Sequence, residues 1–214
     1  MNVTETLSQF IVDVNYDKLP TSVVEAAKVA ILDGVANMLA GSAQELATII
    51  GQYVKESGGT PQSTVIGWGF KANAPSAAFA NGVFGHCLDY EIQGFPPTHG
   101  TSSCLPAALA LGEMRNSPGK TIIAAYVLGW EVQGRLRAAS VAASNPAFHP
   151  PGMVGPLEGP PPAPKSWAST RIRPRWLWAS LLLGLVALPL ILALWSSLLI
   201  QVTLLAWALK LFRQ

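Results

Sequence analysis

Apolar residues near the start of the chain recur every three or four positions, and this spacing together with capping and turn signals predicts successive helices as far as about residue 143. Apolar positions between residues 7 and 14 predict a first helix that ends before Pro20. Residues 22–25 and 42–45 each begin with Ser and end with Glu, a pattern typical of a capping box. They predict a second helix ending near Gly41 and a third over about 43–56.

Turn residues and prolines divide the rest of this region. Glycines and a proline at 58–61 predict a turn, 63–68 a short extended piece, and Pro75 the first turn of a helix reaching about His86. Three further segments are expected: a loop at 89–101, a helix capped by Ser102 or Ser103 that ends before 117, and a long helix over about 121–143. A second loop is expected at 145–155. The fold class is therefore mainly α.

The charge pattern changes abruptly near Glu158. No Asp or Glu follows that residue, whereas the last 56 residues contain six Lys or Arg and five of the seven Trp. The first part carries eight basic and twelve acidic residues, a net charge of −4, and the tail carries +6. We therefore divide the chain into a helical region at 1–157, a Pro- and Arg-rich linker at 158–175 and a hydrophobic tail at 176–209.

Composition excludes several classes of function for the first part. Mild acidity without a basic stripe argues against nucleic-acid binding. The N-terminus has no basic and apolar pattern of a secretory signal. Cys87 and Cys104 are too far apart for a local metal motif, so two small buried thiols are expected, with a disulfide left open.

Acid–base side chains in the two predicted loops are the candidates for chemistry. Asp89, His99 and His149 lie there, and loop residues held by a helical scaffold commonly carry function. For either histidine alone, a hydrogen-bonded structural role is an equal alternative. His86 fits a structural helix-end histidine, and its spacing to His99 and His149 matches no metal-ligand motif, so no metal is expected.

Five segments together resemble the MmgE/PrpD family, which includes 2-methylcitrate dehydratase and cis-aconitate decarboxylase. They read ANGVFGHCLDY at 80–90, TH at 98–99, LPAALALGE at 105–113, GWEVQGRL at 129–136 and FHPPGMVG at 148–155. The last two look most similar to the cis-aconitate decarboxylase branch. The resemblance spans roughly residues 5–157.

This resemblance implies a cofactor-free, mostly helical domain followed by a lid-like α+β domain, acting as a lyase on small polycarboxylates. It implies a cytoplasmic homodimer. It also matches Asp89, His99 and His149 to active-site positions. A histidine with a near-neutral pKa suits proton transfer at carbon. We expect His99 to transfer the proton, His149 to contact a substrate carboxylate and Asp89 to orient or share the proton.

The chain departs from the family pattern in three places. Glu91, Ile92 and Gln93 stand where the family usually has two Asp and a Thr, and Gly100 follows His99 where Pro is common. The family's catalytic Lys lies beyond residue 155, in sequence that this chain lacks. These departures leave the substrate open, and we expect the chain as printed to be inactive.

The tail allows three interpretations. Residues 176–209 are 34 uncharged residues behind three Arg, long enough for one membrane span, although a buried core helix is an alternative. The third interpretation is translation out of frame. If the nucleotides that encode residues 195–205 are read in a shifted frame, they can encode MVKSTHSGNAA, which resembles the family's Lys-containing segment. The nucleotides for 166–170 and 175–188 can encode further family-like strings in the same way.

We favour the frameshift, placed near residues 157–158, over a membrane-anchored, non-catalytic scaffold. Sequencing this junction in both DNA and transcript tests it. The expected result is a shifted frame that encodes the Lys segment beneath Ser196 and Ser197. Nucleotides that offer no such register in any frame would rule the frameshift out.

Overall fold

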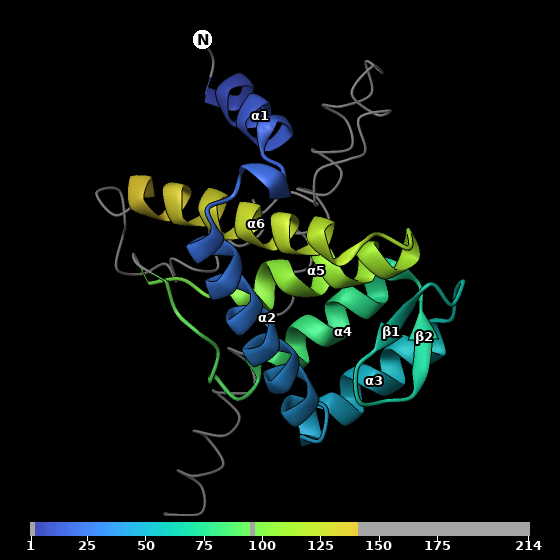
Figure 1. The fold of residues 1–214 in the computed structure, drawn as a ribbon. Coiled ribbons are helices and arrows are strands. Elements are labelled where there is room, and N and C mark those ends of the chain that lie inside the picture. Colours follow the sequence, from blue (N-terminus) through green and yellow to red (C-terminus); the bar gives the residue numbers. More distant parts are fainter. Residues whose placement is uncertain (1–2, 95–96, 141–214) are drawn as a thin grey trace, which may run out of the picture.

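The computed structural model describes residues 3–94 and 97–140, which form an array of helices with one small hairpin (Figure 1). The mainly helical fold class is confirmed. The elements are α1 (Val3–Asp13), η1 (Tyr16–Lys18, a 3-10 turn), α2 (Thr21–Gly41), α3 (Glu45–Ser57), β1 (Ser63–Val65), β2 (Phe70–Ala72), α4 (Ala74–His86), α5 (Gly100–Met114) and α6 (Gly119–Ser140).

Helices α4 and α5 form the centre of the array. α4 packs against α2, α3 and α5, and α5 packs in turn against α6, so α5 lies between α4 and α6 in Figure 1. Phe84 of α4, Met38 of α2 and Leu105 of α5 are fully buried where these helices meet. Apolar burial at this junction is the main favourable term that holds α4 and α5 together.

Two glycines of α2 allow this helix to approach its neighbours closely. A Cβ on Gly41, the last residue of α2, would lie 1.9 Å from the backbone oxygen of Phe84. A Cβ on Gly34 would lie 2.4 Å from the methyl group of Thr101 in α5. Any side chain at either position would push α2 away from the central pair of helices.

The extended piece expected at 63–68 is a strand only at Ser63–Val65, and the sequence analysis missed its partner, Phe70–Ala72. The two strands pair antiparallel, with Ser63 opposite Ala72. Gly67 and Gly69 adopt positive φ in the turn, a conformation that favours glycine. Trp68, between them, donates to the Ser42 backbone oxygen at 3.1 Å and stacks on Phe84, which anchors the hairpin.

Both expected capping boxes are wrong. Helix α2 begins at Thr21, directly after Pro20, and has no side-chain cap. The Ser42 hydroxyl donates backward to the Leu39 oxygen at the end of α2, and α3 begins only at Glu45. Ser42 therefore satisfies a free carbonyl at a helix C-terminus rather than a free amide at an N-terminus.

Other boundaries agree more closely with expectation. Pro75 lies in the first turn of α4, and the preceding Asn73 accepts a hydrogen bond from the Ser76 amide as the cap. Helix α6 begins at Gly119, two residues before its expected start. Within the described residues the two cysteines are not joined by a disulfide; Cys104 is buried and Cys87 half-buried.

The later segments of the sequence analysis lie outside the described residues. These are the last residues of the helix expected to reach 143, the loop at 145–155, the linker at 158–175 and the tail at 176–209. Among the helices of residues 3–94 and 97–140, none combines the length and the apolar character that a membrane crossing requires.

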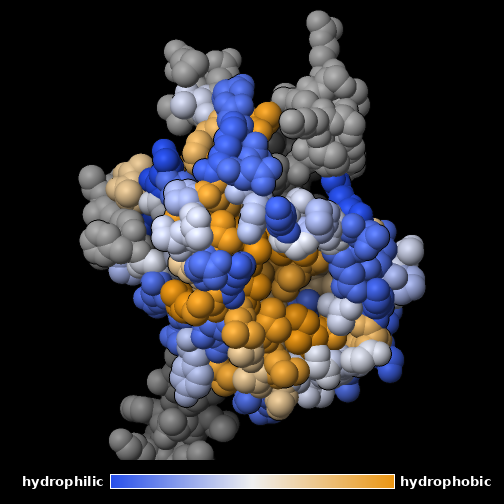
Figure 2. Space-filling model, in the orientation of Figure 1, coloured by the Kyte–Doolittle hydropathy of each residue, from blue (hydrophilic) through white to orange (hydrophobic). Residues whose placement is uncertain are grey.

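One side of α2 presents apolar side chains to solvent. Val29, Leu32 and Leu39 are 64%, 71% and 57% exposed. Figure 2 shows hydrophobic residues gathered over the part of the surface where α2 runs in Figure 1. An exposed apolar stripe of this kind is typical of a surface that makes further contacts.

The close approach at Gly41 predicts a measurable stability difference. We expect Gly41→Ala to destabilise the chain by about 1–3 kcal/mol, because the methyl group collides with the α4 backbone. Gly134→Ala in α6 is the matched control. A Cβ there meets no described atom, so Ala should stabilise by roughly 0.5–1 kcal/mol through helix propensity. Urea denaturation measures both, and equal midpoints would contradict the assigned contact.

Candidate active site

A buried carboxylate occupies the loop between α4 and α5. The side chain of Glu91 is only 1% exposed, although the loop as a whole lies at the surface. Leaving a charged carboxylate without partners inside a protein would cost several kcal/mol, so its hydrogen bonds decide whether this loop is stable. Four donors from three residues satisfy it: two from Ser102 and one each from His86 and His99.

Glu91 caps the start of α5 from outside the helix. The Ser102 amide donates to Oε2 at 2.6 Å and the Ser102 hydroxyl to Oε1 at 2.5 Å. The expectation that Ser102 or Ser103 caps this helix is wrong, because His99 is the N-cap residue and its side chain makes no cap bond. A negative charge at this position also interacts favourably with the helix dipole.

Two imidazoles converge on the same carboxylate oxygen. Nδ1 of His86, the last residue of α4, lies 2.9 Å from Oε1 of Glu91, and Nδ1 of His99 lies 3.1 Å from it. The rings meet edge to face with centroids 4.7 Å apart. Because a carboxylate only accepts hydrogen bonds, each Nδ1 carries the hydrogen. In a neutral ring this leaves Nε2 with the lone pair.

Electrostatics favour charge on both members of the Glu91–His86 pair. The hydrogen bond to Glu91 raises the pKa of His86 above its usual value, although burial acts in the opposite direction. Burial by itself would raise the pKa of Glu91, but hydrogen bonds from His86 and Ser102 outweigh it and lower the pKa. The carboxylate therefore stays ionised across the neutral range.

The structure brings two of the three expected site residues near each other. Asp89 Oδ1 lies 3.9 Å from His99 Nδ1, but its side chain is 72% exposed. Its backbone has a φ of 56°, in the left-handed region that few non-glycine residues adopt. Glu91 is the closer and more buried partner of His99. His149 lies outside the described residues.

Helix α6 supports the loop that carries His99. The Ser103 hydroxyl donates to the His99 backbone oxygen at 2.5 Å, and the fully buried Gln133 donates to the Ser103 hydroxyl at 3.4 Å. Gly100 lies against the indole of Trp130, so close that a Cβ would be 2.6 Å from the ring. These contacts explain why Trp130 and Gln133 of the 129–136 motif matter locally: they fix the start of α5.

Glu91 is the site residue that sequence reasoning missed. The sequence analysis treated it only as a departure from the family pattern. One signal pointed to it: an acidic residue between two histidines, five positions after His86 and eight before His99. Whether such a carboxylate turns inward depends on the loop path, which the local pattern does not determine.

His86, Glu91 and His99 also offer three metal-ligand atoms within 4.8 Å of one another. The nitrogen–oxygen contacts of 2.9 and 3.1 Å are ordinary hydrogen bonds, and Glu91 accepts two more from Ser102. Hydrogen bonding therefore accounts for this arrangement. The expectation of a metal-free site stays a prediction.

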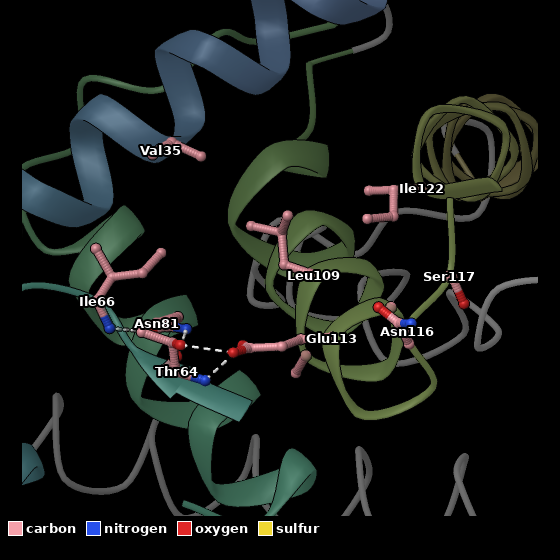
Figure 3. Close-up of a pocket in the computed structure, with 11 residues that line it drawn as sticks. Val35, Thr64, Ile66, Asn81, Leu109, Glu113, Asn116, Ser117 and Ile122 are labelled. Carbon is pink, nitrogen blue, oxygen red and sulfur yellow. Dashed lines mark hydrogen bonds between the residues drawn. The ribbon is translucent and has the colours of Figure 1, made fainter. Parts of the chain in front are cut away.

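A separate cavity of about 360 Å³ lies among β1, α4, α5 and the start of α6 (Figure 3). Its carboxylate, Glu113, accepts from the Thr64 amide at 2.6 Å and the Thr64 hydroxyl at 2.8 Å, and pairs with Lys71 at 2.7 Å. Asn81 in its wall bonds the backbone of Thr64 and Ile66. These groups join the hairpin to the helices, and neither Asp89 nor His99 lines the cavity.

Fold and cluster define a mainly helical domain with an acid–base site in a loop between its two central helices. The family model described as the MmgE/PrpD N-terminal domain matches residues 5–158. The chain therefore belongs to the MmgE/PrpD family, as its sequence motifs predicted.

Several relatives share this region. The cis-aconitate decarboxylase of Mus musculus is 33% identical over 165 residues, covering 73% of this chain and 33% of the relative. That of Homo sapiens is also 33% identical over 165 residues, covering 73% and 34%. That of Aspergillus terreus is 30% identical over 145 residues, covering 64% and 29%. The chain thus spans about a third of the length of the curated relatives it matches.

The shifted pKa values predict a stability maximum at weakly acidic pH. His86, whose pKa rises above 6.5, contributes stability that is full below that value and is lost as pH rises through the folded pKa. Glu91, whose pKa falls below 4.5, contributes stability that is full above that value and is lost as pH falls through the folded pKa.

Both contributions to stability are therefore complete only between pH 4.5 and pH 6.5. We expect Glu91→Gln to flatten the pH dependence of folding stability on both sides of this range. Urea denaturation at a series of pH values measures it. A parent chain and variant with parallel profiles would contradict the pairing.

Proposed function

We propose that this chain derives from a lyase that acts on small polycarboxylates, by decarboxylation of cis-aconitate or dehydration of 2-methylcitrate. The observation that carries the proposal is the pair of contacts at His99: its Nδ1 is held on Glu91 and Asp89 lies nearby. Because Nδ1 keeps its hydrogen on Glu91, Nε2 is the nitrogen that exchanges the proton: it accepts one when the ring is neutral and donates one when the ring is an imidazolium. The names of the relatives favour the decarboxylase alternative.

Both reactions require a proton to move at a carbon atom. In decarboxylation, the bond to the leaving carboxylate breaks, its electrons remain on carbon, and that carbon takes a proton. In dehydration, a base removes a proton from carbon as hydroxide leaves from the neighbouring carbon. We assign this proton transfer to His99, which would donate the proton in decarboxylation and remove it in dehydration. We assign contact with a substrate carboxylate to His149, where a hydrogen-bond donor stabilises the charge.

Asp89 has a supporting part in this proposal. Its exposed carboxylate, 3.9 Å from His99, can orient that ring or share its proton once substrate excludes water. The polycarboxylate substrate, the homodimer and the cytoplasmic location all come from the family resemblance and stay predictions.

We further propose that the chain as printed has little activity. The Lys segment and the lid that the family resemblance implies are absent from the printed sequence, and the tail carries the out-of-frame pattern instead. Without them, the acid–base residues lack the groups expected to bind and enclose a multiply charged substrate.

A membrane-anchored, non-catalytic scaffold is the second candidate. The uncharged run at 176–209 favours it, since a bilayer responds to hydropathy whatever the origin of the segment. This alternative predicts that residues 1–157 fold into a stable, monodisperse domain and that correction of the reading frame brings no gain in activity.

Turnover of cis-aconitate and 2-methylcitrate separates the two candidates. We expect the printed chain to be inactive and a frame-corrected chain to act on one of these acids. In the corrected chain, His99→Ala should lower kcat by about 100- to 10,000-fold, the usual range for a lost acid–base group.

Gly134→Ala is the matched control, because its site on α6 meets no described side chain, and it should keep the parent rate. Near-normal turnover by the His99 variant would remove His99 from the proton-transfer role. Full activity of the printed chain would contradict its proposed inactivity.

A further inference from the structure

The hydrogen bonds of Glu91 are distributed unevenly between its two oxygens. Oε2 accepts one bond, from the Ser102 amide at 2.6 Å. Oε1 accepts three, from the Ser102 hydroxyl at 2.5 Å, His86 Nδ1 at 2.9 Å and His99 Nδ1 at 3.1 Å. One oxygen therefore caps a helix, whereas the other orients two imidazoles. A helix cap alone does not require the second arrangement.

We propose that Glu91 is the positioning residue of the site: its carboxylate fixes His99 in the tautomer with hydrogen on Nδ1 and thereby keeps Nε2 as the proton-transfer atom. The proposal rests on the proposed function and deepens it. Asp89, the carboxylate that the sequence favoured for this task, is farther from His99 and largely exposed. The charge that orients His99 therefore comes from Glu91.

Burial gives Glu91 an advantage that Asp89 lacks. A hydrogen bond between a buried carboxylate and an imidazole is not screened by water, so it discriminates more strongly between the two tautomers. Hydrogen bonds to charged acceptors are also stronger than neutral ones. The exposed Asp89 must compete with solvent for the same nitrogen.

His86 completes the arrangement by balancing charge. It stands on the last turn of α4 and donates to the same oxygen as His99. A proton on His86 neutralises the buried carboxylate, which lowers the cost of keeping Glu91 ionised inside the loop. His86, at the end of α4, thus balances the charge of Glu91, whereas His99, at the start of α5, is the ring that Glu91 orients for proton transfer.

Tautomers of His86 and His99 can be measured directly in the full chain. Nitrogen-15 NMR of the imidazole rings distinguishes a protonated nitrogen from one with a lone pair, and it requires no substrate. In the parent chain, the neutral form of His99 should carry its hydrogen on Nδ1. If that form instead carries it on Nε2, the proposal is overturned without reference to any variant.

Variants then assign the effect to the charge of Glu91. Glu91→Gln should lower the ratio of the Nδ1–H to the Nε2–H form of His99 by about tenfold or more, because a charge-assisted bond is replaced by a neutral one. Glu91→Asp keeps the carboxylate and should restore part of the ratio. An unchanged ratio in the Gln variant would show that the charge has no positioning role.

Glu113→Gln is the matched control. Glu113 also accepts a backbone amide and a hydroxyl, both from Thr64, but it lies at the hairpin and away from the histidines. Its substitution should lower stability without altering either tautomer. An equal change of the His99 ratio in this control would mean that general loosening of the fold, and not Glu91, produces the effect.

Turnover by the frame-corrected chain keeps this proposal separable from the proposed function. We expect Glu91→Gln to lower kcat with little change in KM, and Glu113→Gln to leave kcat near the parent value. A correct parent tautomer without turnover of either acid would contradict the proposed function alone. Turnover that survives Glu91→Gln while the tautomer ratio collapses would contradict the positioning role alone.

Discussion

Burial of the Glu91 carboxylate is the constraint on which the site depends. A lone charge in this loop would be strongly destabilising, so the loop adopts a path on which each oxygen finds donors. Those donors come from the end of α4 and the beginning of α5, through His86, His99 and Ser102. One carboxylate therefore joins two helices, caps one of them and orients two rings.

This arrangement in turn requires that α4 and α5 have fixed positions relative to each other. Fully buried Phe84 and Leu105 lie in the core between them. Gly41 lets α2 approach the backbone of α4, and Gly34 lets it approach the Thr101 and Leu105 side chains of α5. A shift of α4 along α5 would separate His86 from Glu91 before it disturbed the apolar core, since hydrogen bonds tolerate less displacement than apolar contacts.

The sequence predicted the helices well and their ends poorly, and the reason is physical. Apolar spacing, prolines and turn residues together located each of the six helices, because burial follows periodicity and turn residues divide the chain between helices. The Ser-to-Glu patterns misplaced the caps, because a local rule does not register that Ser42 closes the preceding helix or that Glu91 reaches α5 across a loop. The second strand was missed because the apolar positions of three residues do not reveal a pairing partner.

The same reasoning explains why two site residues were found and a third was not. Asp89 and His99 were identified through motif resemblance, which reports residue types that a reaction requires. Glu91 replaces an expected Asp and so looked like a loss, yet the added methylene group still allows its carboxylate to contact both histidines. A motif records which residues usually occupy the positions, whereas burial and hydrogen bonding decide which of them orient the reacting group.

The described residues thus contain a hydrogen-bonded cluster of acid–base side chains, which come from the end of α4, the start of α5 and the loop between them. The contacts of His99 with Glu91 and Asp89 lie within this region. Binding a multiply charged acid needs cationic groups whose charge is not already compensated, whereas in this cluster the charge of a protonated His86 is balanced by Glu91.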